Sequence, residues 1–277
     1  MDLKRTMLWS PTLGDAPYEA RVRAAAENDY PMLTVSPVDV HAAIERGLEP
    51  SELSRWARDL GVESSIMDGF ADWYPHRIPK YSPMPPFDRD EFLALAVAFG
   101  AAAVVLVAPF ATEAGFDEVI EGFAAFCDRA ALDGLAVNLE FTPIAPVGSV
   151  ELAHRVLREA GRPNTGMIFD CWHFFQGTPD FDALAAVPAG MIAGTQISGG
   201  FMGTFTEGLV KDTFRHRLLP GEGDFEIERV LQVLDDKGAL AVCGPEVLST
   251  ELFAMTPTAA AATAAAAYDA LASRLRN

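Results

Sequence analysis

Short apolar runs alternate with amphipathic stretches along the whole chain. The apolar runs predict strands at 6–10, 32–36, 63–67, 103–108, 135–141, 166–170, 191–197 and 240–247. Between them, apolar positions recur at helical spacing at 17–28, 50–60, 88–99, 117–133, 149–160, 181–186 and 225–237. The alanine-rich stretch from Thr256 to Arg276 predicts a closing helix, with Pro257 near its first turn.

This alternation predicts an α/β fold, a single (β/α)8 TIM barrel that covers residues 1–277. No linker rich in serine and glycine and no abrupt shift in charge marks a second domain. The main alternative is a doubly wound open sheet. Against that alternative, no Gly-x-Gly-x-x-Gly motif follows the first predicted strand.

One stretch is long enough to raise the question of a membrane span. Phe92 to Phe110 runs for 19 residues without a charge. It contains Gly100 and Pro109, however, and divides more naturally into a helix that ends at Phe99, a glycine cap and a buried strand at 103–107. The first residues also lack an apolar stretch long enough for a secretory signal.

Composition narrows the partners. Half of the 277 residues are apolar, enough for a sizeable core, and the net charge of −18 repels phosphate backbones and anionic membranes. A small-molecule substrate is therefore expected, with neither nucleic acid nor membrane as a partner, and the oligomeric state stays open. The three cysteines, Cys127, Cys171 and Cys243, form no CxxC pair and predict reduced core thiols of a cytoplasmic protein.

Each of the last four apolar runs has a polar residue at or near its end. These residues are Glu140, Asp170, Gln196 and Glu246. Glu140 and Asp170 are 30 positions apart and Asp170 and Gln196 are 26 apart, each about one strand–helix–strand step. Strand ends meet at one rim of a parallel barrel, so the four side chains are expected to converge there. Buried carboxylates need a neutralising cation, and oxygen donors favour Mg²⁺ or Mn²⁺ over Zn²⁺. The alternative is that each residue caps a helix or pairs with an arginine.

Five stretches carry a resemblance to a known family: NLEF at 138–141, FDCWH at 169–173, TQISGG at 195–200, RLLPGEGDF at 217–225 and GPEV at 244–247. They resemble the xylose-isomerase-like, AP-endonuclease-2-type TIM barrel superfamily, many of whose members are called sugar phosphate isomerases/epimerases. The first half of the chain matches only in its strand–helix rhythm. The resemblance implies metal ligation by Glu140, Asp170, Gln196 and Glu246, and substrate contacts from His173 and Arg217.

Two positions depart from the pattern of that superfamily. Many members have histidine where this chain has Gln196, although an amide oxygen also ligates metals and some dehydroshikimate dehydratases carry glutamine there. The ketose 3-epimerases carry a second acid six residues after the first ligand glutamate, where this chain has Pro146. The chain is therefore not expected to be a close copy of those epimerases.

The expected function is a divalent-metal-dependent isomerase or epimerase of a keto-sugar or keto-polyol, with Glu140 and Glu246 as acid/base groups. A metal-dependent dehydratase of the dehydroshikimate or inosose type shares the first proton abstraction and stays open. A non-catalytic binding or partner subunit is a second alternative. A repair nuclease is disfavoured by the charge of −18 and by only five histidines.

Two further residues have both functional and structural interpretations. His173, three residues after Asp170, is expected to hydrogen-bond a substrate oxygen, although a lone histidine is usually structural. Arg217 is expected to bind a substrate oxygen through its planar guanidinium, and pairing with Glu222 or Asp224 is the alternative.

The loop DGFADWYPHR at 68–77 is unusually aromatic for a segment that follows a strand. Its Trp73, Tyr74 and His76 are expected to line a substrate pocket, or else to form a lid or a subunit contact. No glycine-rich phosphate-binding turn stands out, so the sequence leaves open whether the substrate is phosphorylated.

Overall fold

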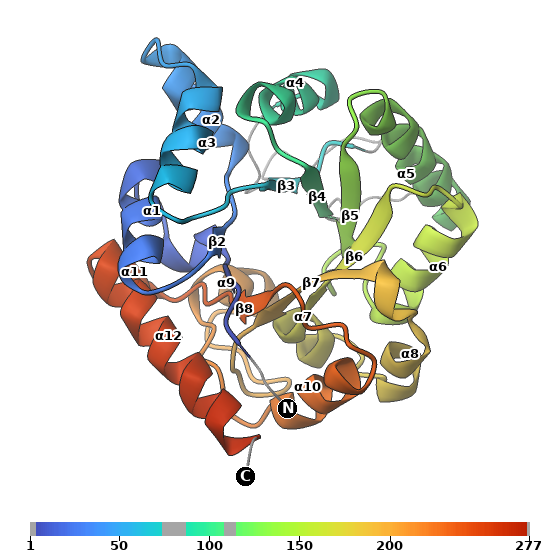
Figure 1. The fold of residues 1–277 in the computed structure, drawn as a ribbon. Coiled ribbons are helices and arrows are strands. Elements are labelled where there is room, and N and C mark those ends of the chain that lie inside the picture. Colours follow the sequence, from blue (N-terminus) through green and yellow to red (C-terminus); the bar gives the residue numbers. More distant parts are fainter. Residues whose placement is uncertain (1–3, 74–86, 108–114, 276–277) are drawn as a thin grey trace.

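The computed structural model describes residues 4–73, 87–107 and 115–275. Eight strands surround a central axis and helices cover them on the outside (Figure 1). The strands are β1 (Met7–Leu8), β2 (Met32–Leu33), β3 (Ile66–Phe70), β4 (Ala103–Val107), β5 (Ala136–Glu140), β6 (Thr165–Asp170), β7 (Ile192–Ile197) and β8 (Cys243–Pro245).

Backbone hydrogen bonds close the strands into a barrel. β3 to β8 form one parallel sheet in chain order, and β1 pairs with β2 in a second parallel sheet. The amide of Val35, just after β2, donates to the carbonyl of Ile66 over 3.0 Å. The amide of Thr6, just before β1, donates to the carbonyl of Cys243 over 2.9 Å. Both seams between the two sheets are therefore bonded, and the predicted α/β barrel is confirmed.

The helices agree with the predicted ranges within a few residues, and four short helices were not predicted. The predicted ones are α1 (Tyr18–Glu27), α3 (Pro50–Asp59), α4 (Arg89–Phe99), α5 (Phe116–Ala131), α6 (Val150–Ala160), α8 (Phe181–Ala186), α10 (Ile227–Asp236) and α12 (Pro257–Arg274). The others are α2 (Pro37–Glu45), α7 (Cys171–Gln176), α9 (Leu209–Arg215) and α11 (Thr250–Phe253), with 3-10 turns at Ser10–Leu13 and Ala189–Met191. At 4 to 9 residues, the unpredicted helices are too short for a clear apolar period.

The long uncharged stretch divides as its glycine predicts. α4 ends at Phe99, and Gly100 caps it in the left-handed conformation with φ of 83°. The next residues enter β4, whose central side chains are buried. Within the described residues, no helix combines the length and the apolar character needed to cross a bilayer.

Five apolar side chains pack inside the barrel below the strand ends. Met7, Trp9, Ile66, Val105 and Ile168 come from β1, β3, β4 and β6 or the residue after β1, and form a cluster separate from the main core. The Trp9 indole donates to the carbonyl of Thr195 over 3.2 Å. A Cβ at Gly194 would lie 3.1 Å from the Trp9 ring, so a larger residue there would require that ring to shift. This packing fills one end of the barrel and leaves the polar side chains at the other.

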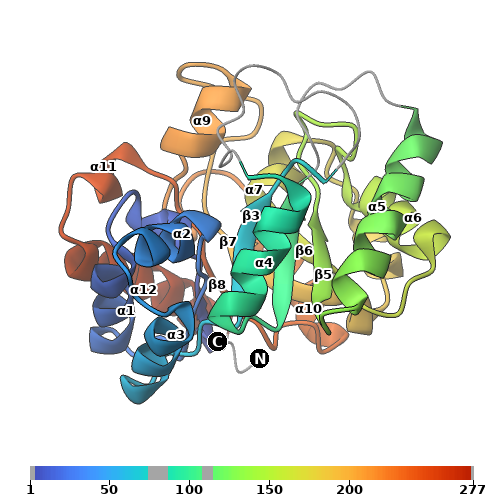
Figure 2. The same ribbon diagram turned by 90° about the horizontal axis from the view of Figure 1, so that it is seen from above.

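The helix α9 lies on the side of the barrel at which the strands end (Figure 2). The three cysteines are buried and free, as the prediction of core thiols requires. Burial also raises the pKa of the Cys171 thiol, and the Asp170 carboxylate adds to that rise. These cysteines therefore belong to the packing of the fold.

Candidate metal centre

The strands deliver the four predicted ligand residues to the same end of the barrel. Glu140 and Asp170 are the last residues of β5 and β6, Gln196 lies in β7 beside Asp170, and Glu246 follows β8 directly. All four side chains are buried. Parallel pairing places these residues at neighbouring strand ends, which is why residues 106 positions apart in sequence meet.

Arg217 joins two of the carboxylates. Its Nη1 donates to Asp170 Oδ2 over 2.8 Å and to Glu246 Oε2 over 2.9 Å, and its Nε donates to the carbonyl of Thr213 over 2.9 Å. Arg217 is 3% exposed. The pairing with Glu222 or Asp224 that the sequence left open does not form, because those carboxylates accept from backbone amides instead. Arg217 therefore belongs to the centre.

His173 approaches Glu140 and Asp170. Its Nε2 lies 3.3 Å from Glu140 Oε1 and 3.4 Å from Asp170 Oδ2. One donor atom each from Glu140, Asp170 and His173 lie within 4.8 Å of one another, close enough to share a metal ion. The side chain predicted to bind substrate is therefore also placed to donate nitrogen to a cation.

Gln196 has one satisfied end and one unsatisfied end. Its Nε2 donates to Glu246 Oε1 over 2.9 Å, whereas its buried Oε1 has no hydrogen-bond partner among the described residues. A buried carbonyl oxygen without a donor is costly, at about 1–3 kcal/mol. A bound cation is one partner that would satisfy it.

The alternative interpretation of these residues accounts for part of the arrangement. Asp170 caps α7, since its Oδ1 accepts from the amide of Trp172 over 2.7 Å, and it also pairs with Arg217. Helix capping and arginine pairing explain neither the approach of Glu140 to Asp170 and His173 nor the unpaired oxygen of Gln196. A cation would satisfy both of these remaining features.

Burial and mutual repulsion shift the titration of the acids. Burial raises the pKa of Glu246 well above its ordinary value, and the charges of Glu140, Asp170 and Asp68 add to the rise while Arg217 opposes it. Burial also acts to raise the pKa of Asp170, but Arg217 and His173 outweigh it and the pKa is lowered. Full ionisation of these acids would therefore leave more negative charge than Arg217 alone offsets.

Asp68 is a further acid that the sequence reading did not single out. It lies in β3 and lines the same cavity as Glu140 and Glu246. Burial raises its pKa to about 8, and the charges of Glu140 and Asp170 add to that rise. The predicted strand at 63–67 ended too early, which placed Asp68 at the start of a loop. An acid that interrupts an apolar run, in Ile66–Phe70, was the available signal.

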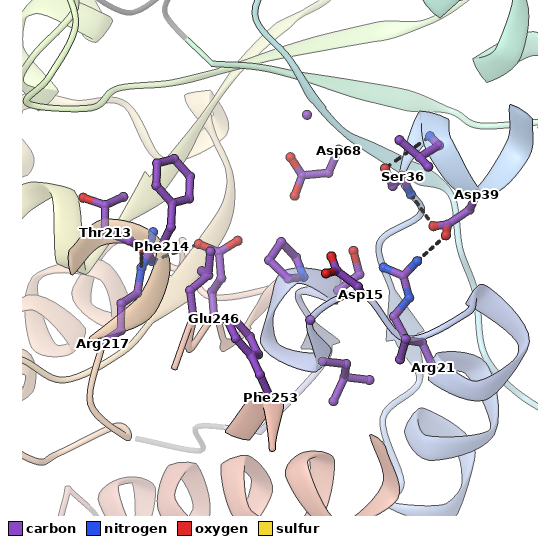
Figure 3. A pocket seen from close by; sticks show the side chains of 18 of the residues that line it. Asp15, Arg21, Ser36, Asp39, Asp68, Thr213, Phe214, Arg217, Glu246 and Phe253 are labelled. Atoms are coloured by element: carbon purple, nitrogen blue, oxygen red, sulfur yellow. Dashed lines mark hydrogen bonds and ion pairs between the residues drawn. The ribbon is translucent and has the colours of Figure 1, made fainter. Parts of the chain in front are cut away.

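A cavity of about 790 Å³ opens above these side chains. Glu140, His173, Arg217 and Glu246 line one side of it, while Asp170 and Gln196 are not among its lining residues. Figure 3 shows Arg217 and Glu246 on one side and Arg21 and Asp39 on the other, with Asp68 between them. A cavity of this size holds a small organic substrate.

Trp73 does not line this cavity. Its indole nitrogen donates to the carbonyl of Val107 over 2.7 Å, and its ring meets the edge of Phe123 with centroids 5.9 Å apart. Trp73 is 4% exposed and packs between β4 and α5. Trp73 therefore packs against the fold in this structure and its expected pocket role stays a prediction, while Tyr74 and His76 lie outside the described residues.

The donor set fits a divalent cation. Glu140, Asp170 and His173 each offer a donor atom close enough to share one ion. Glu246 lies next to them through its hydrogen bonds with Arg217 and Gln196, and the Gln196 oxygen lacks a donor. Oxygen donors suit Mg²⁺ or Mn²⁺, and an imidazole nitrogen extends the range to Zn²⁺.

Comparison with known proteins agrees with the resemblance seen in the sequence. A family model described as xylose isomerase-like TIM barrel matches residues 22–274. An inosose isomerase from Halalkalibacterium halodurans is 26% identical over 133 residues, which are 47% of this chain and 46% of that protein. The chain thus aligns with less than half of the length of that relative.

Solved structures share the fold over nearly the whole chain. An IOLI protein with a binding zinc atom superposes with a TM-score of 0.82 at 16% identity, covering 98% of this chain and 99% of that one. An L-ribulose 3-epimerase gives 0.72 at 16% identity, covering 98% and 95%. The probable 3-DHS dehydratase AsbF from Bacillus anthracis gives 0.70 at 14% identity, covering 99% of both chains. At these identities the likeness establishes the fold.

Proposed function

Because the chain belongs to the xylose isomerase-like TIM barrel family, we propose that it is a divalent-metal-dependent isomerase or epimerase of a keto-sugar or keto-polyol. The observation that carries the proposal is the convergence of Glu140, Asp170, Gln196 and Glu246, linked by Arg217, His173 and each other, at the end of the barrel where the cavity opens. The inosose isomerase among its relatives and the L-ribulose 3-epimerase with the same fold support this class of substrate.

The carboxylates of Glu140, Asp170 and Glu246 and the Oε1 of Gln196 would hold the cation. When bound, such an ion polarises a substrate carbonyl and stabilises negative charge on its oxygen. The mostly oxygen donor set favours Mg²⁺ or Mn²⁺. The solved IOLI protein carries zinc, and His173 is the side chain through which this chain would accept that ion instead.

Glu140 and Glu246 are the acid/base groups in this proposal. They line the cavity from β5 and from the residue after β8, so they reach a substrate from two different strand ends. One carboxylate removes a proton from the carbon beside the carbonyl, and the other returns a proton to the product. Glu246 is assigned the removal of the proton, since it lines the cavity and hydrogen bonds from Gln196 and Arg217 orient its two oxygens.

Arg217 and His173 orient these groups. Arg217 fixes Asp170 and Glu246 relative to each other through two hydrogen bonds from one nitrogen. His173 lines the cavity beside Glu140, where its Nε2 can donate to a substrate oxygen instead of the carboxylates. Both residues thereby act on the position of the substrate and of the base.

A dehydratase is the second candidate, and two residues favour it. Gln196 stands at a position where some dehydroshikimate dehydratases, which the chain resembles, also have glutamine. Pro146 replaces the second acid of the ketose 3-epimerases. The likeness to the solved AsbF structure extends over 99% of the chain. The same proton abstraction followed by loss of a β-hydroxyl would give this reaction.

Nuclear magnetic resonance in D₂O tests the proposed function. The protein with Mn²⁺ is incubated with ketoses, inososes and dehydroshikimate, the metal is removed, and deuterium is located in the recovered compounds. We expect deuterium at the carbon beside the carbonyl of at least one compound. A rearranged product identifies an isomerase or epimerase, and loss of water identifies the dehydratase.

The matched variants are Glu246→Gln and Glu222→Gln. The first removes the proposed base and is expected to abolish exchange, while the second changes a glutamate that does not line the cavity. Metal content is measured in both, so that loss of the base is separated from loss of the ion. The absence of deuterium from every compound, with metal bound, would overturn the proposal.

A further inference from the structure

Arg21 and Asp39 form a buried ion pair in the cavity wall, on the side away from Glu246 and Arg217 (Figure 3). Arg21 comes from α1 and Asp39 from α2, and their side chains are 8% and 9% exposed. Asp39 Oδ1 accepts from Arg21 Nη2, and Asp39 Oδ2 accepts from the amide of Ser36 over 2.9 Å. The proposed chemistry assigns no role to this pair.

The pair is held rigidly but is incompletely bonded. Asp39 completes the capping box of α2 with Ser36, so the carboxylate that orients Arg21 is fixed by a helix start. The Nε of Arg21 is buried and has no hydrogen-bond partner within the described part of the chain. A guanidinium that lies beside a cavity and has an unpaired N–H is suited to donate hydrogen bonds to oxygen atoms of a ligand.

The charge of the cavity wall decides which ligand fits. Two guanidinium groups line it, and both already pair with carboxylates: Arg21 with Asp39, and Arg217 with Asp170 and Glu246. The lining carboxylates among the described residues are Asp15, Asp39, Asp68, Glu140 and Glu246. A divalent cation would offset only part of this negative charge.

A phosphate group would therefore meet repulsion from the wall and no unpaired described guanidinium. A hydroxyl group fits better, because it donates to Asp39 and accepts from Arg21 at once. The cavity of about 790 Å³ has room for a substrate that reaches from the carboxylates to this pair.

We propose that Arg21 and Asp39 bind the hydroxyl groups at the far end of the substrate, and that the site takes an uncharged polyol in preference to its phosphorylated form. The inference rests on the proposed function, since it names the substrate class of the same cavity. Asp15 lines the wall between the two ends and disfavours an anion there too.

Binding of unreactive ligands tests the inference without turnover. Dissociation constants are measured by ligand-observed magnetic resonance with Mg²⁺ present, for myo-inositol against inositol monophosphate and for D-fructose against fructose 6-phosphate. We expect the uncharged member of at least one pair to bind at least tenfold more tightly. Equal or tighter binding of both phosphates, or binding of none of the four compounds, would overturn the inference.

Arg21→Gln should weaken binding of the preferred uncharged ligand at least tenfold. Arg23→Gln is its matched control, because Arg23 lies on the same helix, is exposed and does not line the cavity. Unchanged binding in Arg21→Gln would contradict the inference. Asp39→Asn keeps the side-chain shape and leaves Arg21 unneutralised, so it should improve phosphate binding relative to the uncharged ligand at least fivefold.

If Arg21→Gln does not fold, Asp39→Asn still tests the inference. An unchanged ratio of the dissociation constants for the phosphorylated and uncharged ligands in Asp39→Asn would also contradict it. The proposed function can fail while the inference holds. If the protein still prefers the uncharged ligand but no deuterium exchange occurs, the proposed function is contradicted and the inference stands. If exchange occurs and a phosphorylated substrate is accepted equally well, the inference is contradicted and the proposed function stands.

Discussion

Gln196 donates its amide nitrogen to Glu246 Oε1 over 2.9 Å and leaves its own buried oxygen without a partner. The hydrogen bond fixes which end of the amide faces Glu246, so the oxygen is turned to the other side. A buried acceptor in this state costs about 1–3 kcal/mol. This unpaired oxygen is the feature of the centre that most directly calls for a cation.

Gln196→Leu should therefore weaken the binding of Mn²⁺, because it removes both the amide oxygen and the donor that orients Glu246. We expect a loss of about 10–100-fold, the range found when groups that support metal ligands are removed. Isothermal titration measures it. Gln176→Leu is the control, since both ends of that buried amide are already paired. Equal affinities in the two variants would exclude Gln196 from the centre.

His173→Gln separates substrate binding from metal binding at this histidine. If His173 binds the substrate, its replacement should lower kcat/KM at least about tenfold. That loss corresponds to about 1.4 kcal/mol of transition-state stabilisation. The affinity for Mn²⁺ should then change little. A drop in affinity as large as that of Gln196→Leu would instead identify His173 as a ligand, as its position beside Glu140 and Asp170 allows.

Arg217→Met should destabilise the protein in chelator by about 3–5 kcal/mol. The substitution leaves the carboxylates of Asp170 and Glu246 buried without the guanidinium that pairs with both. Mn²⁺ should restore most of the lost stability by taking over that charge. Thermal unfolding with and without a chelator measures both effects. Arg162→Met breaks an exposed pair with Asp128 and should change the stability little. A similar cost in both variants would contradict the central role of Arg217.

The raised pKa of Asp68, about 8, predicts how stability depends on pH. An unfolded aspartate titrates near pH 3.9, so between about pH 4 and 8 the folded protein binds the extra proton and loses stability as pH rises. In chelator, Asp68→Asn should flatten this decline and raise the Tm at pH 8 by at least about 2 °C. A wild-type Tm that stays constant from pH 5 to 8 would contradict the assignment. In the wild type, Mn²⁺ affinity should increase over the same range, because the ion displaces protons.

Much of the fold follows from local sequence. The ends of β5, β6 and β7 were predicted within a few residues, because apolar runs bounded by polar residues mark buried strands. The positions of Glu140, Asp170, Gln196 and Glu246 at one rim then follow from barrel geometry. Their roles as ligands remain a prediction.

Some features were missed although a local signal was present, and others depend on residues far away along the chain. The helix α2 has little apolar periodicity, yet Ser36, Pro37 and Asp39 carry a helix-start signal that was available. The pairing of Asp39 with Arg21 depends on how two helices pack, which no local pattern contains. Trp73 follows a strand as a pocket residue would, and its contacts with the carbonyl of Val107 and the ring of Phe123, far away in sequence, contribute to its burial.

Diffraction from crystals grown with Mn²⁺, recorded at the manganese absorption edge, tests the central claim most directly. The account predicts one strong anomalous peak within ligand distance of Glu140, Asp170, Glu246 and the oxygen of Gln196, with Arg217 beside it. A map without a peak there at saturating Mn²⁺, with Arg217 still bonded to both carboxylates and the Gln196 oxygen bound to a water or a protein donor, would contradict it.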